Sequence, residues 1–459
     1  MRKGKLVTIF LVVAMVLTTV AFCFAACNND VDKKEVVLRI LENDTAKKEG
    51  YLKELLDAFN AKYASEGVKA VDANMDEFSD LEKDGPYGHG PDVLYQANDI
   101  LMSYVEKHHI IPLDIEQMDC YDKIPQNAWN AFKYNYDGKT VYCGVPVNVQ
   151  QPLLFYRKDA LPDNWKTEWD KNGNDVPDMV EYWTEMYRYS KGIREADRNK
   201  FGYAIELRNE YFNIGFLLSY GAYVFGNNNT DDKDIGIAKG NAVKGAKIMW
   251  ELANGTIFAT ITTPDITSQF LKEMSLQYQK EGLDQASADA KAKENLVITG
   301  LPKLPKDGDI TTQQDIKNGD LWIEQQTMGG VNGYAVSSYT KNRDWAVKFV
   351  EFATGYEMVK ARADMLGVVA ARSDVIAQTE SLASQITYRN LDSGVLEVMP
   401  SISAVKQIWT PISSGFKQIA TDGCGKRSFD TAKLQSVIEE ISTRLFIPLH
   451  NYDKFERKI

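Results

Sequence analysis

The sequence predicts an α/β fold with a parallel sheet, and the first part of the chain carries this prediction. The apolar runs at 35–42 and 68–71 have the length and composition of strands, and the stretch 50–64 between them has the pattern of an amphipathic helix. Strand, helix and strand in this order are typical of a parallel α/β sheet. A length of 459 residues allows two or three domains.

The N-terminus predicts a lipoprotein signal peptide at 1–26. Basic residues precede an almost wholly apolar run at 6–24, and small residues stand before Cys27, which resembles a lipobox. We expect Cys27 to carry the lipid, followed by a polar tether at 28–35. The protein would then lie outside the cell, at the outer face of the membrane, and touch the membrane only through this anchor. The alternative is an uncleaved spanning anchor, because the apolar run is long enough to cross a bilayer.

The charge of the mature chain argues against a nucleic acid as partner. The full sequence has a net charge of −11, and removal of the signal peptide takes away three basic and no acidic residues, which gives −14. No basic stripe is visible that would neutralise phosphates. Cys120, Cys143 and Cys424 remain in the exported part, so at least one thiol should be free. No CxxC motif or Cys/His cluster indicates zinc.

A crossing between two domains is predicted at 137–161, DGKTVYCGVPVNVQQPLLFYRKDAL. Asp137 and Gly138 form a turn pair, and two apolar, strand-like pieces follow, joined by a polar stretch that contains Gln150. Pro146 argues against a regular central strand throughout. The stretch resembles the "YNGK…YGVP…LxYNKDLL" pattern at the first hinge crossing of maltose- and maltodextrin-binding proteins. These belong to family 1 of the extracellular solute-binding proteins, the binding subunits of ABC sugar importers.

The resemblance implies a two-lobed, periplasmic-binding-protein-like fold of type II. Its lobes are discontinuous and are joined by three hinge crossings, near Asn148, Val331 and Gly367. The ligand is expected to bind between the lobes, and closure is expected to be a hinge motion. The implied boundaries are 27–148 with 331–366 for the first lobe, and 149–330 with 367–459 for the second.

The same resemblance implies the function. It is the capture of an oligosaccharide, with maltose or maltodextrin as the first expectation, and its delivery to an ABC permease by a monomeric binding protein. The resemblance covers most of 35–445. The family pattern is lost at 257–327, where a partner-specific insertion and a rearranged pocket wall are both open.

Polar residues beyond two strand ends are candidate sugar ligands from the first lobe. In open α/β sheets the ligand lies beyond the carboxyl ends of the strands, which is where Asp44 and Asp99 are expected. The segment GPDVLYQAND at 90–99 resembles the family's "GPDIxxxxHD", whose final aspartate bonds sugar hydroxyls, and this implies that role for Asp99. Gln96 stands where the family often has a stacking tryptophan, so the identity of the sugar stays open.

The second lobe supplies the candidate aromatic platforms. The segment RNEYF resembles the family's "EPYF", which implies that Tyr211 stacks on a sugar and that Asn209 replaces a glutamate. The segment VMPSISAVKQIW resembles "MPNIPxxxxFW", which implies a stacking role for Trp409. Gln150 completes the candidate set. Sugars present C–H faces and hydroxyl edges, so rings beside hydrogen-bonding side chains suit them, although core packing is the usual role of a single ring.

The loop 170–181, DKNGNDVPDMVE, predicts a structural Ca²⁺ site. Side-chain oxygens fall at positions 1, 3, 5, 9 and 12 and a carbonyl at position 7, as in an EF-hand; these ligands are Asp170, Asn172, Asn174, Val176, Asp178 and Glu181. Asp175 replaces the usual glycine at position 6, and Pro177 replaces the apolar residue at position 8. The alternative is a surface turn with Asp178 as a helix-start carboxylate.

A lipid-anchored carbohydrate-active enzyme is one alternative function, and an adhesin is another. A glycosidase needs two facing carboxylates, and in an acid-rich chain the spacing alone does not exclude them. The sequence contains no GxSxG, HExxH, Walker or GxGxxG pattern, and its four histidines form neither a triad nor a metal motif. An adhesin would not need three interdomain crossings. We therefore expect a binding protein that is not an enzyme.

Overall fold

The computed structural model describes residues 35–136, 138–200, 202–253, 260–263, 267–425 and 429–455. The predicted signal peptide and Cys27, the expected lipidation site, lie outside these residues, as does Asp137 of the predicted turn. Among the helices within the described ranges, none is both long and apolar enough to cross a bilayer.

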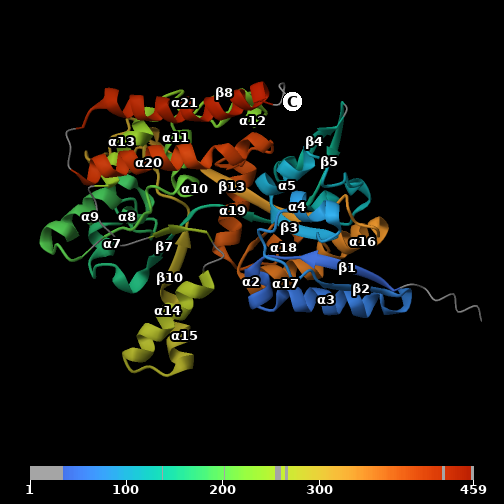
Figure 1. Ribbon diagram of the computed structural model, residues 1–459. Coiled ribbons are helices and arrows are strands. Elements are labelled where there is room, and N and C mark those ends of the chain that lie inside the picture. Colours follow the sequence, from blue (N-terminus) through green and yellow to red (C-terminus); the bar gives the residue numbers. More distant parts are fainter. Residues whose placement is uncertain are drawn as a thin grey trace, which may run out of the picture.

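A seven-stranded sheet organises the half of the molecule on the right of Figure 1. Its strand order is β14-β6-β13-β3-β1-β2, with β15 beside β13. Strand β1 pairs parallel with β2 and β3, whereas β13 pairs antiparallel with β3 and β6, so the predicted parallel α/β start is confirmed. The strands are β1 (Val36–Leu41), β2 (Val68–Asp72), β3 (Val93–Ala97), β6 (Val145–Gln150), β13 (Thr327–Val336), β14 (Val369–Ala370) and β15 (Leu396–Val398).

Helix α3 (Tyr51–Lys62) covers this sheet beside β2 and packs against α16 and α17 (Figure 1). Its predicted apolar face is buried, and Phe59 on that face lies 4.9 Å, between ring centroids, from Phe349 of α16. The other helices and strands of this half are α2 (Asp44–Lys48), α4 (Leu81–Asp84), α5 (Asn98–Val105), α6 (Gln126–Trp129), β4 (Lys133–Tyr136), β5 (Lys139–Tyr142), α16 (Arg343–Ala353), α17 (Tyr356–Leu366), α18 (Ser373–Ile376) and α19 (Leu382–Ser393).

Strand β6 is central although it contains Pro146. The register between β6 and β13 shifts between Asn332 and Gly333, which is an irregularity of the kind that accommodates a proline without an N–H. Gly333 lies opposite Pro146, and a Cβ there would stand 2.3 Å from the Val145 carbonyl oxygen. The glycine is therefore required for the close approach of the two strands at this irregularity.

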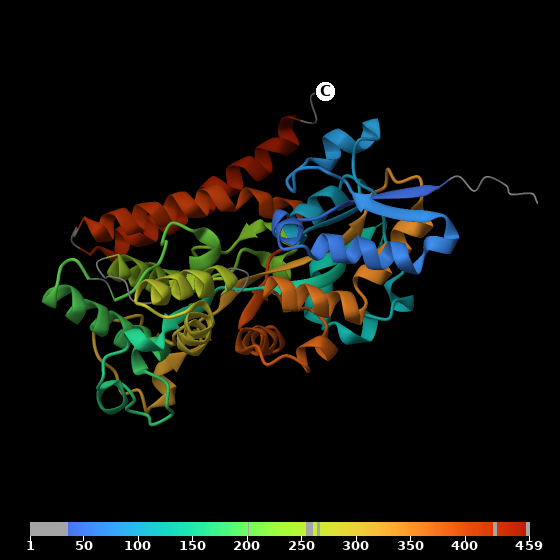
Figure 2. The same ribbon diagram turned by 90° about the horizontal axis from the view of Figure 1, so that it is seen from below.

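The half on the left of Figure 1 is mainly helical and contains a three-stranded sheet with the order β10-β7-β9. Helices α20 and α21 pack against each other and against α13, and the first two lie side by side in Figures 1 and 2. The elements are β7 (Leu153–Arg157), α7 (Trp165–Glu168), α8 (Asp178–Glu181), α9 (Trp183–Ala196), α10 (Glu210–Asn213), α11 (Gly215–Leu218), α12 (Gly226–Asn229), β8 (Asp231–Ile235), α13 (Ala242–Leu252), β9 (Thr260–Thr262), β10 (Leu296–Thr299), β11 (Leu304–Pro305), β12 (Trp322–Ile323), α20 (Trp409–Cys424) and α21 (Thr431–Phe455).

A helical hairpin occupies part of the segment in which the family pattern is lost. Helices α14 (Thr267–Lys280) and α15 (Gln285–Asn295) project from the strands β9 and β10 (Figure 1). The hairpin has a small apolar core of its own, with Met274 and Tyr278 facing Ala288 and Ala292. Its connection through β9 and β10, which both pair with β7, fixes the hairpin to the sheet of the second half.

Two large apolar cores divide the described chain. The first core takes its buried residues from 38–149 and 331–396, and the second core takes them from 154–328 and 399–445. By packing alone, the segment from β14 to β15 therefore lies mostly with the first core. The predicted lobe boundaries at residues 148, 331 and 367 describe which segments move together in hinge closure. Core packing does not test that motion, so these boundaries stay a prediction.

Two local expectations from the sequence differ from the structure. The pattern around Phe201 to Ile205 predicts a strand, but no strand forms over 202–205. Gly202 packs directly on α9, where a Cβ would stand 2.6 Å from the Cα of Ser190. A helix expected over 373–383 ends at Ile376, and a new helix, α19, begins after Ser381, whose side chain accepts from the Ser384 N–H and caps it.

Candidate functional site

The carboxyl ends of β1 and β3 meet at one edge of the large sheet. The two strands are parallel neighbours, with Ile40 opposite Val93, so the residues that follow them lie close together. Asp44 starts α2 directly beyond β1, and Asp99 lies in the first turn of α5 directly beyond β3. This is the position at which the sequence predicts ligand-binding side chains.

Glu77 links two of the predicted ligand residues. The Asp44 N–H donates to Glu77 Oε2 at 2.7 Å, and the Gln96 side-chain amide donates to the Glu77 carbonyl oxygen. Asp44 itself keeps its carboxylate in solvent, with 71% of the side chain exposed. Glu77 lies in an acidic loop without periodicity, so no local pattern in the sequence distinguishes it from its neighbours.

Asp99 and Trp409 are in contact although they come from opposite ends of the chain. The indole of Trp409, at the start of α20, lies close enough to the Asp99 carboxylate to lower the pKa of that carboxyl. Burial raises the pKa of Asp99, while the Ile100 N–H, the Lys406 charge and the Trp409 side chain act in the opposite direction. Burial lowers the pKa of the Lys406 ammonium, and the Asp99 charge opposes that shift. No local pattern in the sequence indicates Lys406 as a neighbour of Asp99.

Tyr211 is held at the end of the β6–β13 ladder. Its hydroxyl donates to the Gln150 carbonyl oxygen and accepts from the Gly330 N–H, each at 3.2 Å. Gln150 and Gly330 are themselves partners in the strand register. The hydroxyl thus fixes the Tyr211 ring of α10 against β6 and β13, of which β13 contributes buried residues to both cores, and Tyr211 remains half-buried.

Asn209 has a structural task at the start of α10. Its side-chain oxygen accepts from the Phe212 N–H at 3.0 Å and caps the helix. The cap sets the direction of the helix that carries Tyr211. The amide nitrogen of Asn209 is therefore the part of this side chain that is suited to a ligand.

Asn98 joins the elements around the site. Its amide donates to the Met399 carbonyl oxygen at 3.1 Å and its oxygen accepts from the Val331 N–H at 3.3 Å. The bond to Met399 holds the segment before α20 against the start of α5. The structure thus brings Asp99 together with Trp409, Gln150 with Tyr211, and Asp44 with Gln96 through the loop around Glu77.

The predicted calcium loop is tightly wound. The two carboxylate oxygens of Asp170 accept from the N–H groups of Asn174 and Asp175 at 3.0 and 3.2 Å. Asp175 has φ of 61°, so it adopts the left-handed conformation usual for position 6 of such loops. The amides of Asn172 and Asn174 both donate to Glu181 Oε2 at 2.9 Å. Positions 3, 5 and 12 therefore converge on one point.

Asp178 is the least compensated group of this loop. It is fully buried, one oxygen accepts from Lys171 N–H at 3.2 Å, and the other has no partner. Burial is the largest cause of a raised Asp178 pKa, and the nearby Glu185 charge adds to it. Over the described ranges, no three His, Cys, Asp or Glu side chains are grouped closely enough to hold a metal ion. A cation here would depend on the two asparagine oxygens.

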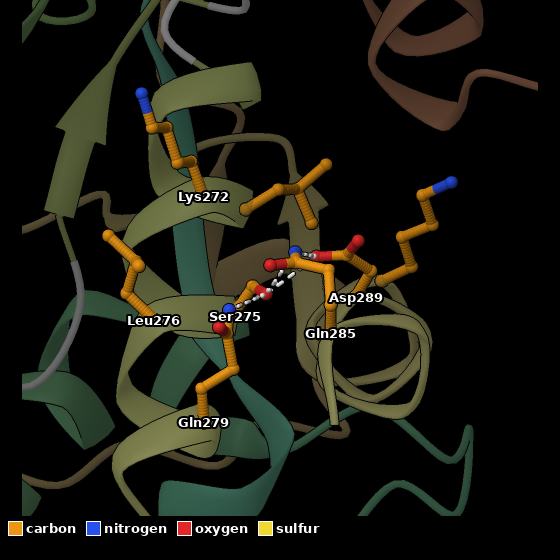
Figure 3. A pocket seen from close by; sticks show the side chains of 8 residues that line it. Lys272, Ser275, Leu276, Gln279, Gln285 and Asp289 are labelled. Carbon is orange, nitrogen blue, oxygen red and sulfur yellow. Dashed lines mark hydrogen bonds between the residues drawn. The ribbon is translucent and has the colours of Figure 1, made fainter. Parts of the chain in front are cut away.

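A small pocket of about 320 Å³ lies between α14 and α15 (Figure 3). Its polar residues bond one another: Asp289 accepts from Ser275 at 2.5 Å and from Gln285 at 2.8 Å. In Figure 3, Lys272 points away from this network. Because the carboxylate at its base is already satisfied, we assign no ligand to the pocket.

The sequence matches a known protein family over most of its length. The family of bacterial extracellular solute-binding proteins matches residues 54–387. The chain belongs to this family. This solute-binding protein is 24% identical over 434 residues to the galactooligosaccharide-binding protein of Bacillus subtilis. The alignment covers 92% of this chain and 94% of the relative.

Two further relatives carry related names. The maltodextrin-binding protein of Bacillus subtilis is 25% identical over 398 residues, with 84% of this chain and 86% of the relative covered. A maltooligosaccharide ABC transporter solute-binding lipoprotein of Streptococcus pneumoniae is 24% identical over 375 residues, with 79% and 80% covered. The family is thus one of transporter binding proteins.

Solved structures confirm the two-lobed fold of this solute-binding protein. The extracellular solute-binding protein of Staphylococcus aureus in complex with maltose aligns with a TM-score of 0.65 at 19% identity and covers 92% of this chain and 99% of its own. The maltose-binding periplasmic protein of Listeria monocytogenes in complex with maltose gives 0.66 at 18% identity, with 91% and 99% covered.

Proposed function

We propose that this protein captures an oligosaccharide between its two lobes and delivers it to the permease of an ABC importer. The contact between Asp99 and Trp409 is the observation that carries the proposal. It places a carboxylate acceptor and an aromatic face together where the two cores adjoin, beyond the end of β3. A ring and a charged acceptor side by side suit the C–H face and the hydroxyl edge of one sugar.

Maltose or a maltodextrin is the first ligand to test, and a galactooligosaccharide is the second. The names of the maltodextrin-binding and galactooligosaccharide-binding relatives support this pair. Gln96 and Asn209 depart from the maltose-binding pattern, and both use part of their amide within the protein. We therefore expect substitutions of these two side chains to change the preference between glucose and galactose units most.

The anchor proposal is that Cys27 carries a diacylglyceryl group and that the mature protein lies on the outer face of the membrane as a monomer. The named lipoprotein of Streptococcus pneumoniae supports it. Two or three acyl chains give stable attachment, at about 0.8 kcal/mol for each buried CH₂. Cys27→Ala in an exporting host should leave the precursor uncleaved. If palmitate labels that variant as strongly as the wild type, Cys27 is not the residue that carries the lipid.

We also propose that the protein has no enzymatic activity. Its family consists of solute-binding proteins. The test is a thermal-unfolding panel with maltose, maltotriose, maltotetraose and a β-galactooligosaccharide, with product analysis on each sample. A rise in melting temperature with intact sugar supports capture. Hydrolysed sugar would instead support a carbohydrate-active enzyme, and no shift with any sugar would oppose the proposed ligand class.

A structural Ca²⁺ ion in the loop 170–181 is a separate proposal. The ligands are the oxygens of Asp170, Asn172, Asn174, Asp178 and Glu181 with the carbonyl of Val176. The amide nitrogens of Asn172 and Asn174 now face Glu181, and rotating each amide by half a turn would direct its oxygen to the same point. A cation there would also compensate the buried Asp178 carboxylate, whose second oxygen has no partner.

A further inference from the structure

We propose that Phe78 is a sugar-stacking platform at the rim of the first core, and that it determines the preference for longer oligosaccharides. The inference rests on the proposed oligosaccharide function. The candidate ligand residues from this side of the site, Asp44, Gln96 and Asp99, include no aromatic ring. Phe78 supplies one, on a loop that contacts two of them.

The ring of Phe78 is open to solvent. Phe78 is 73% exposed, far more than the buried phenylalanines Phe59, Phe132 and Phe349 in the same half of the molecule. A single exposed apolar residue is ordinary on a protein surface. The argument therefore depends on where the ring is and how firmly its backbone is held.

The loop that carries Phe78 is attached to the predicted ligand residues on both sides. Glu77, its direct neighbour, accepts from the Asp44 N–H at 2.7 Å through its carboxylate and from the Gln96 amide through its backbone oxygen. The residues Asp44 and Gln96 follow or end the parallel neighbours β1 and β3. Phe78 thus directly follows the residue, Glu77, whose two bonds tie the loop to Asp44 and Gln96 at the edge of the sheet.

The loop is also held internally. The N–H groups of Phe78 and Ser79 both donate to Asp76, at 2.8 Å to its carboxylate and 2.9 Å to its carbonyl oxygen. Lys47 of α2 donates to the Met75 carbonyl oxygen at 2.7 Å. A backbone fixed in this way loses little freedom when a ligand arrives, so an exposed ring on it can bind at low entropic cost.

The chemistry around the ring fits a carbohydrate. Asp44 presents an exposed carboxylate, and Glu77, whose carboxylate accepts from the Asp44 N–H, directly precedes Phe78 in the chain. A flat apolar face with acceptors at its edge matches the C–H face and the hydroxyls of a pyranose. Asp99 and Trp409 already form a pair, so a ring at the Phe78 loop serves a different sugar unit along the chain.

This position predicts an effect that depends on chain length. A disaccharide seated at Asp99 and Trp409 gains little from Phe78, whereas a tetrasaccharide or pentasaccharide extends to the rim. Phe78→Ala should therefore weaken binding of the longer sugars about tenfold, the loss expected for an exposed stacking residue at the edge of a site. The disaccharide should lose much less, and the melting temperature without sugar should stay the same.

The test is a calorimetric titration with a maltose-to-maltopentaose series, or the matching galactooligosaccharides if the wild type prefers them. Tyr87→Ala is the matched control, because Tyr87 is 79% exposed and lies in the turn Gly85–Tyr87, outside the loop that bonds Asp44 and Gln96. Phe78→Trp should retain or improve binding of the longer sugars.

The outcomes separate this inference from the proposed function. If Phe78→Ala binds every chain length as Tyr87→Ala does, while Trp409→Ala loses binding, the platform is wrong and the oligosaccharide function stands. An equal loss at all lengths would overturn the assignment to the rim. If the wild type binds no member of either series, the proposed function itself fails.

Discussion

The indole of Trp409 lies beside the carboxylate of Asp99, and this contact joins the first turn of α20 to the first turn of α5. Asn98, next to Asp99, fixes the same junction through Met399 and Val331. The geometry of one predicted ligand residue therefore depends on the other.

The first prediction concerns this pair. Trp409→Ala removes the ring and the N–H and should weaken binding of the best sugar by roughly thirtyfold, about 2 kcal/mol, as for a central aromatic residue. Trp409→Phe keeps a ring and should lose less. Asp99→Asn removes a charged acceptor and should also weaken binding. Calorimetry on the three variants checks this, and wild-type affinity in both Trp409→Ala and Asp99→Asn would contradict the site.

The second prediction concerns pH. Burial raises the Asp99 pKa above its unfolded value, so folding takes up a proton between the two values. The contribution of Asp99 to stability should therefore increase as pH falls through that window. Sugar affinity should change in the opposite direction, because a protonated Asp99 is a weaker acceptor. Urea unfolding and calorimetry between about pH 7 and about pH 4 measure both trends. Asp99→Asn should reduce the pH dependence of both stability and sugar affinity. A wild-type affinity that does not change with pH would contradict the proposed role of the Asp99 carboxylate.

The third prediction concerns a buried ion pair below the site. Arg362 bonds both oxygens of Glu42, at 2.8 and 3.3 Å, and both residues are almost fully buried. Arg362→Met leaves the Glu42 carboxylate without its charge partner and should cost about 3–5 kcal/mol in urea unfolding. The double variant with Glu42→Gln should recover part of that loss. A single variant within ~1 kcal/mol of wild type would show that the pair is not needed.

Glu42 also affects the ligand residues through the backbone. Its second oxygen accepts from the Asn43 N–H at 3.1 Å, directly before Asp44. Loss of Arg362 should therefore weaken sugar binding as well as stability.

The fourth prediction concerns calcium. Saturating Ca²⁺ should raise the melting temperature and a chelator should lower it, since an ion bound only to the folded state at 100 times its Kd adds about 2.7 kcal/mol. Asp170→Asn with Glu181→Gln should abolish the response and leave sugar binding unchanged. Glu195→Gln, an exposed acid on α9 outside the loop, is the control. A wild type indifferent to both Ca²⁺ and chelator would leave only a surface turn.

Much of the fold could be predicted because its elements leave local patterns. The apolar face of α3 and the valine-rich β6 need no distant partner to be recognised in the sequence. The end of α18 was missed, although Ser381 is a residue type that commonly caps a helix. The absent strand at 202–205 depends on the packing of Gly202 against α9, which no local pattern reports.

The residues of the candidate site also separate into those that a local sequence pattern indicates and those that depend on distant contacts. The structure confirms that Asp44 and Asp99 lie beyond the ends of two neighbouring strands, while their role in sugar binding stays a prediction. No local pattern indicates Glu77 or Lys406, because each of them meets its partner, Asp44 or Asp99, from a distant segment of the chain. The capping role of Asn209 had a local signal, since asparagine before a helix is a common N-cap.

Small-angle X-ray scattering with and without saturating oligosaccharide tests the central claim most directly. Capture between two lobes predicts that the radius of gyration falls when the best sugar of the panel is added, as expected for hinge closure. The double variant Trp409→Ala with Tyr211→Ala should show no such change. A sugar that binds the wild type with an unchanged radius of gyration, or binds the double variant equally well, would contradict the account.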